Sequence, residues 1–325
     1  MNLLFIARGG ERTGLGHFAR SCRLVETARR RGHEAELFCL LDGPMSPVPD
    51  GAQVIADEAE LVGALRSRSS DHVIVVDMLV VRGALERALE TSLVPVVALC
   101  PVAAGAAWPS LVILRSAPDC HDERIPHLIG VEFTVLGQPV MRIPEATFAK
   151  RLDSPVRRIA VCFGGADPDN ETLTTVRALA SRIDARLEVF LGPAYSHDEA
   201  ALQLGGHAGP TVVKVLRVDD GLWAQLGRSS ALVGGGGLLA YEAAYSGLPS
   251  VHLVARGIRR QMLAPLEESG AILLVDRDAG EPYRRLQEVV AGLDREALQE
   301  MRRAGLALPL GDGHVRCIQA IEDRF

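Results

Sequence analysis

Short, nearly continuous runs of Val, Ile and Leu alternate with helical stretches along most of this chain. The clearest run is His72–Asp77 (HVIVVD), and residues 3–7 and 250–254 are similar. These runs lack the alternation of a half-exposed strand, so both faces of each strand must be covered. Covered strands that are separated by helices indicate a parallel sheet in an α/β fold.

The pattern runs through the chain twice. Strands are predicted at 3–7, 34–41, 72–77 and 94–99, and again at 158–163, 187–191, 212–216, 231–233, 250–254 and 272–275. The 325 residues suffice for two domains, each with its own core. We predict two doubly wound, Rossmann-like α/β domains that face a cleft, at 1–145 and 146–325. The proline-containing segment 142–155 is the predicted linker.

Composition excludes several classes of protein. With 48% hydrophobic residues and a net charge of −6, the chain is not disordered, and mild acidity with 4% aromatic residues argues against nucleic-acid binding. The six cysteines are far apart, as expected of free, buried thiols in a reducing compartment. The uncharged stretch 91–114 contains three prolines, which predicts two buried strands and not a membrane span. The start does not resemble a signal peptide, so we expect a cytoplasmic protein.

The first candidate site follows the strand at 3–7, in segment 9–20 (GGERTGLGHFAR). Ligands of open parallel sheets bind beyond the carboxyl ends of the strands. Gly14 and Gly16 would let a ligand approach the backbone, at a helix start that favours negative charge. We expect the helix to lower the pKa of His17 and keep it neutral, as a general base requires. The alternative is that His17 only lines a turn.

The same segment reads as G-x-G-x-x-A, the pattern of dinucleotide-binding loops. In that interpretation Asp42, at the end of the next strand, would bind a ribose. The loop is longer than the tight turn of that pattern, so a nicotinamide cofactor is the weaker alternative.

A second glycine cluster lies between a predicted strand and a helix that begins at Leu238. Its four consecutive members are Gly234, Gly235, Gly236 and Gly237. Successive amide N–H groups at a helix start can hold a diphosphate, so all four are expected at the phosphate site. Glu242, further along that helix, is placed to accept hydrogen bonds from a ribose. The alternative is that the glycines only allow close packing and that Glu242 is solvated.

Other candidates carry weaker signals. Gly165 belongs to a third strand-to-helix loop, in which Asp167 or Asp169 would act as a ligand or as a helix cap. Asp77 ends a buried strand and would position a substrate or cap the next helix. The consecutive residues 120–123 (CHDE) cannot all face one ion, so no metal is expected. His252 is read as an ordinary strand-end histidine.

Taken together, these clusters resemble the pseudaminic-acid pathway hydrolase family, which cleaves UDP from a 2,4-diacetamido-trideoxy sugar. The resemblance covers most of the chain and rests on four stretches: GLGHxxR at 14–20, RGH at 31–33, FGGADP at 163–168, and 234–249 from the glycine run to Gly-Leu-Pro. It implies a fold similar to the GT-B glycosyltransferases, including the lipid-II-forming N-acetylglucosaminyltransferase. It also implies that His17 is the catalytic base, that the glycine run holds the diphosphate, and that Glu242 holds the uridine ribose.

The sequence departs from the family pattern at three places. Leu238 and Leu239 stand where the family has Ser-Thr, which removes two hydroxyl donors. Leu79 replaces a tyrosine, and an Asn-Gln pair that faces the sugar is here Arg260-Gln261. The added charges of Arg256, Arg259 and Arg260 would suit phosphates.

The resemblance predicts a nucleotide-sugar hydrolase without a cofactor. The domain at 1–145 would hold the sugar or acceptor and the catalytic histidine, and the domain at 146–325 would hold the nucleotide, with UDP the expected one. One alternative is a GT-B glycosyltransferase, in which the same base activates an acceptor hydroxyl. Another is a nucleotide-binding protein that has lost catalysis.

Overall fold

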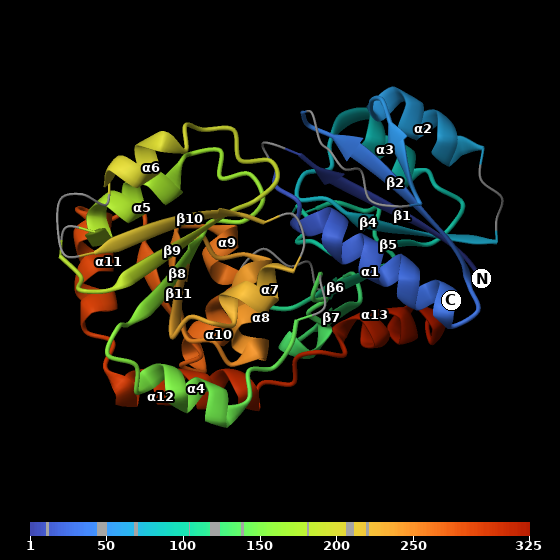
Figure 1. Cartoon of the computed structure of the whole chain (residues 1–325). Helices are drawn as coiled ribbons and strands as arrows, with labels where there is room; N and C mark the ends of the chain where they lie inside the picture. Colours follow the sequence, from blue (N-terminus) through green and yellow to red (C-terminus); the bar gives the residue numbers. More distant parts are fainter. Residues whose placement is uncertain are drawn as a thin grey trace. The chain divides into compact units, whose positions relative to one another are not determined.

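The computed structural model describes residues 1–10, 13–43, 51–67, 71–103, 105–117, 124–137, 140–180, 182–205, 211–218 and 221–325. The chain forms two compact units (Figure 1). The first unit is Met1–Gln138 together with Pro309–Phe325, and the second is Pro139–Leu308. Each unit has its own buried core, so the expectation of two α/β domains is confirmed.

The first unit contains a seven-stranded, wholly parallel sheet in the order β3-β2-β1-β4-β5-β6-β7. Its strands are β1 (Asn2–Gly9), β2 (Glu34–Leu41), β3 (Ala52–Ile55), β4 (His72–Asp77), β5 (Val96–Ala98), β6 (Leu111–Leu114) and β7 (His127–Ile129). Its helices are α1 (Gly16–Arg30), α2 (Glu58–Arg66), α3 (Gly83–Glu90), the 3₁₀ helix η1 (Val131–Phe133) and α13 (Gly313–Glu322).

The second unit contains a six-stranded parallel sheet in the order β10-β9-β8-β11-β12-β13. Its strands are β8 (Arg158–Cys162), β9 (Arg186–Leu191), β10 (Val212–Arg217), β11 (Ala231–Gly234), β12 (Ser250–Val254) and β13 (Ile272–Asp276). Its helices are α4 (Glu145–Leu152), α5 (Glu171–Ala180), α6 (Ala200–Gly205), α7 (Leu222–Leu226), α8 (Leu238–Ser246), α9 (Ile258–Gln261), α10 (Ala264–Glu268), α11 (Pro282–Ala291) and α12 (Arg295–Ala307).

The strand order reverses once in each sheet. Chain order runs outward from β1 to β3 on one side of the first sheet and from β4 to β7 on the other; β8 and β11 meet in the same way in the second. Open α/β sheets bind ligands at this reversal, beyond the carboxyl ends of the strands. In register, Ala7 lies beside Asp77 and Cys162 beside Gly234, so two of the predicted sites fall at the two reversals.

The division of the chain differs from the predicted boundary at 145/146. The last helix, α13, packs on α1 and η1 of the first unit and buries Cys317, Ile318 and Ile321 there. An amphipathic helix can cover either core, and its sequence pattern does not say which. Segment 142–155 is not a linker either, because it contains α4, whose Phe148 is fully buried in the core of the second unit.

Of the other predicted strands and helices, some are confirmed and one is wrong. Stretch 91–114 forms β5 and β6 as expected, and no helix in the described ranges is long and apolar enough to cross a membrane. The sequence also indicates one helical stretch at 259–269. The structure has two short helices there, because Pro265 lacks an N–H and is tolerated only in the first turn of α10. The five cysteines that the structure describes are free thiols, and four of them are buried.

Candidate active site

The loop after β1 closes on itself before α1 begins. The Gly14 N–H donates to the Gly10 carbonyl at 2.9 Å, and the Gly10 N–H donates back at 3.2 Å. Asp42 accepts the Thr13 N–H at 2.8 Å and also the Thr13 hydroxyl. A Cβ on Gly10 would lie 2.3 Å from the Asp42 carboxylate, so only glycine fits. Asp42 therefore holds the loop, and the ribose role considered for it loses its support.

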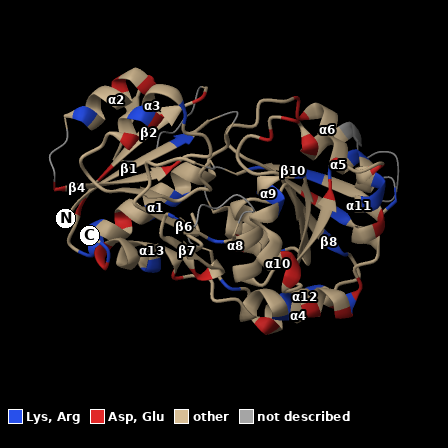
Figure 2. Cartoon of the chain, turned by 180° about the vertical axis from the view of Figure 1, so that it is seen from behind, with Lys and Arg blue, Asp and Glu red and all other residues tan. Residues whose placement is uncertain are grey.

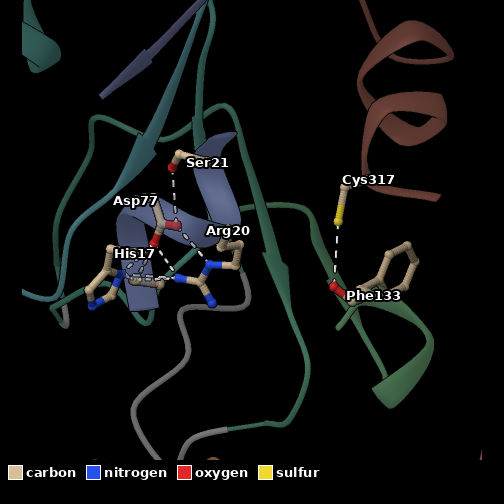
Figure 3. Close-up of polar contacts among 7 residues, drawn as sticks. His17, Arg20, Ser21, Asp77, Phe133 and Cys317 are labelled. Atoms are coloured by element: carbon tan, nitrogen blue, oxygen red, sulfur yellow. Dashed lines mark hydrogen bonds and ion pairs between the residues drawn. The ribbon is translucent and has the colours of Figure 1, made fainter. Parts of the chain in front are cut away.

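His17, in the first turn of α1, is paired with Asp77, the last residue of β4. The His17 Nδ1–H donates to Asp77 Oδ1 at 2.7 Å (Figure 3). Asp77 is fully buried, whereas the His17 side chain is 12% exposed. Asp77 does not cap α3, whose N-cap is Arg82, and its burial keeps it from a ligand. The capping alternative is therefore wrong, and a catalytic role for Asp77 beside His17 stays a prediction.

Arg20 lies one turn after His17 on the same face of α1 and shares the Asp77 carboxylate. Its Nε donates to Asp77 Oδ2 at 2.7 Å, and its Nη2 donates to Oδ1. The Ser21 hydroxyl donates to Oδ2 at 3.4 Å, and the Cys100 thiol to Oδ1 at 3.2 Å. Asp77 thus collects side chains of α1 (Figure 3) and that of Cys100, which lies two residues after β5. Arg20 is part of the GLGHxxR motif, but the sequence suggested no role for it. No sequence pattern pointed to Ser21 or Cys100.

The charges of this cluster fix its protonation. Burial alone would raise the pKa of Asp77, but Arg20 and His17 outweigh burial and hold it well below its usual range. Burial likewise favours neutral His17, yet the charge and hydrogen bond of Asp77 prevail and raise the pKa of His17 to about 9. The expectation of a neutral His17 is therefore wrong. A carboxylate at 2.7 Å outweighs the partial charge of a helix end.

The same cluster has the donor atoms of a metal site, but a cation of the protein already occupies it. The ligand atoms of His17, Asp77 and Cys100 lie within 4.8 Å of one another. Arg20 Nη2 donates to Asp77 and lies 3.2 Å from His17 Nδ1 and 3.4 Å from Cys100 Sγ. A metal ion would have to displace this guanidinium. The sequence 120–123, considered above as a set of ligands, lies outside the described residues.

In the second unit, the first half of the glycine run is packed closely against β8 and the loop after it. A Cβ on Gly234 would lie 2.3 Å from the Cys162 carbonyl oxygen, so strand packing demands glycine there. A Cβ on Gly235 would lie 3.1 Å from Cδ1 of the Phe163 ring, which is tighter than an ordinary van der Waals contact. The packing alternative therefore explains both glycines. These contacts concern the Cβ position and not the backbone N–H groups, so the expectation that Gly234 and Gly235 serve the diphosphate stays a prediction.

The second half of the run has a special backbone conformation before α8. Gly236 and Gly237 have φ values of 71° and 76°, which favour glycine. A Cβ on Gly236 would meet Leu263 and Val254 at 2.9 Å, whereas a Cβ on Gly237 would meet no atom within 4 Å. Packing thus leaves only the open position of Gly237 unexplained.

His252, in the middle of β12, fixes the shape of this run. Its Nδ1 accepts the Gly236 N–H at 3.0 Å, and its Nε2–H donates to the Ser250 hydroxyl at 2.9 Å. Burial lowers the pKa of His252 to about 3, so the ring is neutral. The reading as an ordinary strand-end histidine missed this role. The available signal was a histidine inside an otherwise apolar strand, SVHLV.

Glu242 and Leu238 follow the run along α8. Glu242 is 7% exposed and accepts a hydrogen bond from the Trp223 indole at 3.3 Å. The alternative of a solvated residue is therefore wrong for Glu242. Leu238 begins the helix, and Leu239 packs against the core of the second unit.

The loop after β8 is held by helix capping. Asp167 accepts the N–H groups of Glu171 and Thr172, each at 2.9 Å, so it caps α5. Asp169 forms an ion pair with Arg277 at 2.8 Å. Gly165 packs closely against the loop after β9, because a Cβ on Gly192 would lie 2.5 Å from the Gly165 Cα.

Two of the three arginines considered for phosphates have acidic partners. Arg256 pairs with Asp276 at 2.7 Å, and Arg260 Nη2 donates to both Glu267 oxygens, at 2.9 and 3.1 Å. Arg260 Nη1 is buried with no hydrogen-bond partner in the part of the chain that the structure describes. The N–H groups of Arg260 Nη1 are therefore unsatisfied in this structure, and a phosphate role for Arg260 stays a prediction. Gln261 is the last residue of the same short helix, α9.

Comparisons with known proteins agree with this architecture. MurG from Acinetobacter baumannii superposes with a TM-score of 0.64 at 13% identity, over 99% of this chain and 100% of that one. The spinosyn forosaminyltransferase SpnP gives 0.62 at 13% identity, over 99% of each chain. A putative UDP-N-acetylglucosamine 2-epimerase from Listeria monocytogenes gives 0.60 at 14% identity, over 100% of this chain and 97% of that one. The chain has the GT-B glycosyltransferase fold.

The GT-B fold is what the sequence resemblance implied, whereas the hydrolase family itself stays a prediction. No family model matches the chain. The uncharacterized protein MJ1062 of Methanocaldococcus jannaschii is 22% identical over 137 residues, which are 42% of this chain and 28% of that protein. This match therefore spans little more than a quarter of the relative.

Proposed function

We propose that this chain is an enzyme that transfers a glycosyl group from a nucleotide sugar to an acceptor hydroxyl. The observation that carries the proposal is the His17–Asp77–Arg20 cluster at the strand reversal of the first sheet. The structures that share the fold include a forosaminyltransferase and an epimerase, and the epimerase is named for a UDP-sugar. Both support a nucleotide-sugar substrate.

The second unit would bind the nucleoside diphosphate, with UDP as the expected nucleotide. The amides around Gly237 and the start of α8 would face the diphosphate, where N–H groups and the helix dipole favour negative charge. Arg260 Nη1 would add a charged donor, with Gln261 beside it. Glu242 would accept from the ribose hydroxyls. These groups would stabilise the charge that develops on the leaving diphosphate.

The first unit would supply the proton acceptor. Asp77 holds His17 through Nδ1, and Nε2 has no hydrogen-bond partner among the described residues. Once deprotonated at Nε2, His17 would take the proton of the acceptor hydroxyl. The acceptor oxygen would then bond to the anomeric carbon as the bond to the diphosphate breaks. Gly14 and Gly16, where a Cβ would meet no atom within 4 Å, would leave room for the substrate.

Hydrolysis is the second candidate, with water in place of the acceptor. It is favoured by the GLGHxxR sequence at 14–20, on which the resemblance to the hydrolase family rests. The residues and the proton transfer would be the same in both reactions. Only the acceptor differs.

The test measures nucleoside diphosphate released from a panel of UDP-, dTDP- and GDP-sugars, with and without sugar and lipid acceptors. Release that needs an acceptor indicates transfer, and release without one indicates hydrolysis. His17→Gln should lower the rate by at least about 100-fold. The matched control is His33→Gln, which alters a histidine of the same unit that pairs with Glu322. A His17→Gln enzyme at the wild-type rate would remove His17 from the mechanism.

A further inference from the structure

A polar groove lies at the end of the second sheet opposite to the glycine run. The glycine run is at the carboxyl end of β11, whereas this groove is at the start of β8, and all strands of the sheet are parallel. Its volume is about 550 Å³, and its walls come from α4, the start of β8 and the chain after α7. Ligand pockets for small molecules are commonly about 300–1,000 Å³. The groove is therefore large enough for one.

The side chains of the groove carry positive charge only. Four of them are cationic, three carry hydroxyls, and none is acidic. The polar members are Lys150, Arg151, Arg158, Arg228, Thr147, Ser154 and Ser230. Lys150 and Arg228 have no ion pair within the described ranges. Arg158 is 4.0 Å from Glu188, its nearest acid, and Arg151 donates to the Ser229 carbonyl at 3.3 Å. Three of the four charges thus have no acidic partner among the described residues.

Further arginines crowd the same edge of the sheet. Arg158 lies in register with Arg186 on the neighbouring strand β9. Buried nitrogens of Arg157 (Nε and Nη2) and Arg186 (Nε) have no hydrogen-bond partner in the part of the chain described. Figure 2 shows basic residues on α4 and β8 of this unit. Like charges close together repel one another, and an anion bound in the groove would offset that repulsion.

We propose that this groove binds a diphosphate group. Guanidinium groups bind phosphate oxygens bidentately, and hydroxyls can donate to the remaining oxygens. The four cationic side chains come from three separate segments of the chain and surround the groove. This spacing suits two linked phosphate groups better than a single phosphate. The site is separate from the glycine run, so this proposal does not depend on the proposed function.

The test is calorimetric titration of the whole protein with sodium pyrophosphate. We expect the double variant Lys150→Gln/Arg228→Gln to bind pyrophosphate at least 10-fold more weakly than the wild type. The matched control, Lys214→Gln/Arg303→Gln, removes the same charge from exposed positions of the same unit and should bind as the wild type does. All altered side chains are exposed, so unchanged circular dichroism should verify the fold. Equal affinity in the two double variants, or no binding by the wild type at 1 mM, would overturn the proposal.

The diphosphate can come from inorganic pyrophosphate or from a nucleoside diphosphate, and titration with UDP separates the two sources. If the wild type binds one UDP molecule more than Lys150→Gln/Arg228→Gln does, the groove takes nucleoside diphosphates. If UDP binding is the same in both and only pyrophosphate binding is weakened, the groove takes inorganic pyrophosphate. Either result supports the diphosphate site.

Discussion

Asp77 is the residue on which the candidate active site of the first unit depends. It is fully buried, yet it is ionised, because His17, Arg20, Ser21 and Cys100 all donate to it. A buried carboxylate is stable when several groups donate to it, and removal of one donor leaves its charge less compensated. The carboxylate fixes both the orientation and the charge of His17.

This charge predicts the pH dependence of the reaction. If deprotonated His17 is the base, its active fraction grows as pH approaches its pKa of about 9. The value of kcat/KM should therefore rise with pH up to about 9. Asp77→Asn removes the group that raises the pKa, so the rise should move to lower pH. A wild-type rate that instead falls as pH passes 9 would show that protonated His17 is the active form.

The same pKa predicts a loss of stability at high pH. A group whose pKa is higher in the folded state stabilises the fold below its unfolded pKa, and this contribution is lost as pH rises through the folded pKa. For His17 the window runs from 6.5 to about 9. The free energy of unfolding of the first unit should fall by about 3 kcal/mol across it. Urea unfolding at both ends of the window measures this, and His17→Gln serves as reference. Equal pH slopes in the two proteins would contradict the assignment.

At the scale of elements, the β11–α8 turn combines packing with an open backbone. Gly234 touches β8, Gly235 lies against the Phe163 ring, Gly236 is held by His252, and Gly237 borders open space. Only the last position has no structural explanation beyond its φ angle.

Two alanine variants separate these roles. Gly234→Ala places a Cβ 2.3 Å from a carbonyl oxygen of β8, which should cost about 1–3 kcal/mol of stability. Gly237→Ala should cost about 1–3 kcal/mol through its backbone conformation alone. A methyl group at Gly237 should also lower UDP affinity at least 10-fold. Thermal unfolding and calorimetric titration measure the two effects, and full UDP affinity in Gly237→Ala would remove this position from the binding site.

Local pattern explains which elements the sequence predicted. β2, β4 and β12 match their predicted bounds and α8 begins at its predicted residue, because apolar runs and glycines at turns are local signals. His17 and the glycine run were found because they follow strand ends. The links from Asp77 to Arg20 and Cys100, and from His252 to Gly236, are long-range contacts, and no local pattern encodes them.

At the scale of the whole molecule, the chain returns to the first unit at its end. α13 completes a core that otherwise belongs to residues 1–138, and Ile318 is almost fully buried in it. The sequence prediction placed this helix in the second unit, since neither composition nor spacing marks which core it covers.

Ile318→Ala should therefore act on the first unit. We expect a loss of about 2–5 kcal/mol in its unfolding free energy, with unchanged affinity for UDP, which is assigned to the second unit. Leu179→Ala, fully buried in α5, is the matched variant of the second unit. Calorimetry with and without UDP distinguishes them. A loss of UDP affinity in folded Ile318→Ala would show that the nucleotide depends on the first unit.

The most direct test of the account is a thermal-shift comparison of UDP, CDP, GDP, TDP, CMP and NAD on the wild type and on His17→Gln. A ligand at a hundred times its dissociation constant adds about 2.7 kcal/mol to stability. The account predicts that UDP stabilises both proteins equally, because the nucleotide is held in the second unit and His17 acts on the transferred group. Stabilisation by NAD alone, or by none of the six compounds, would contradict it.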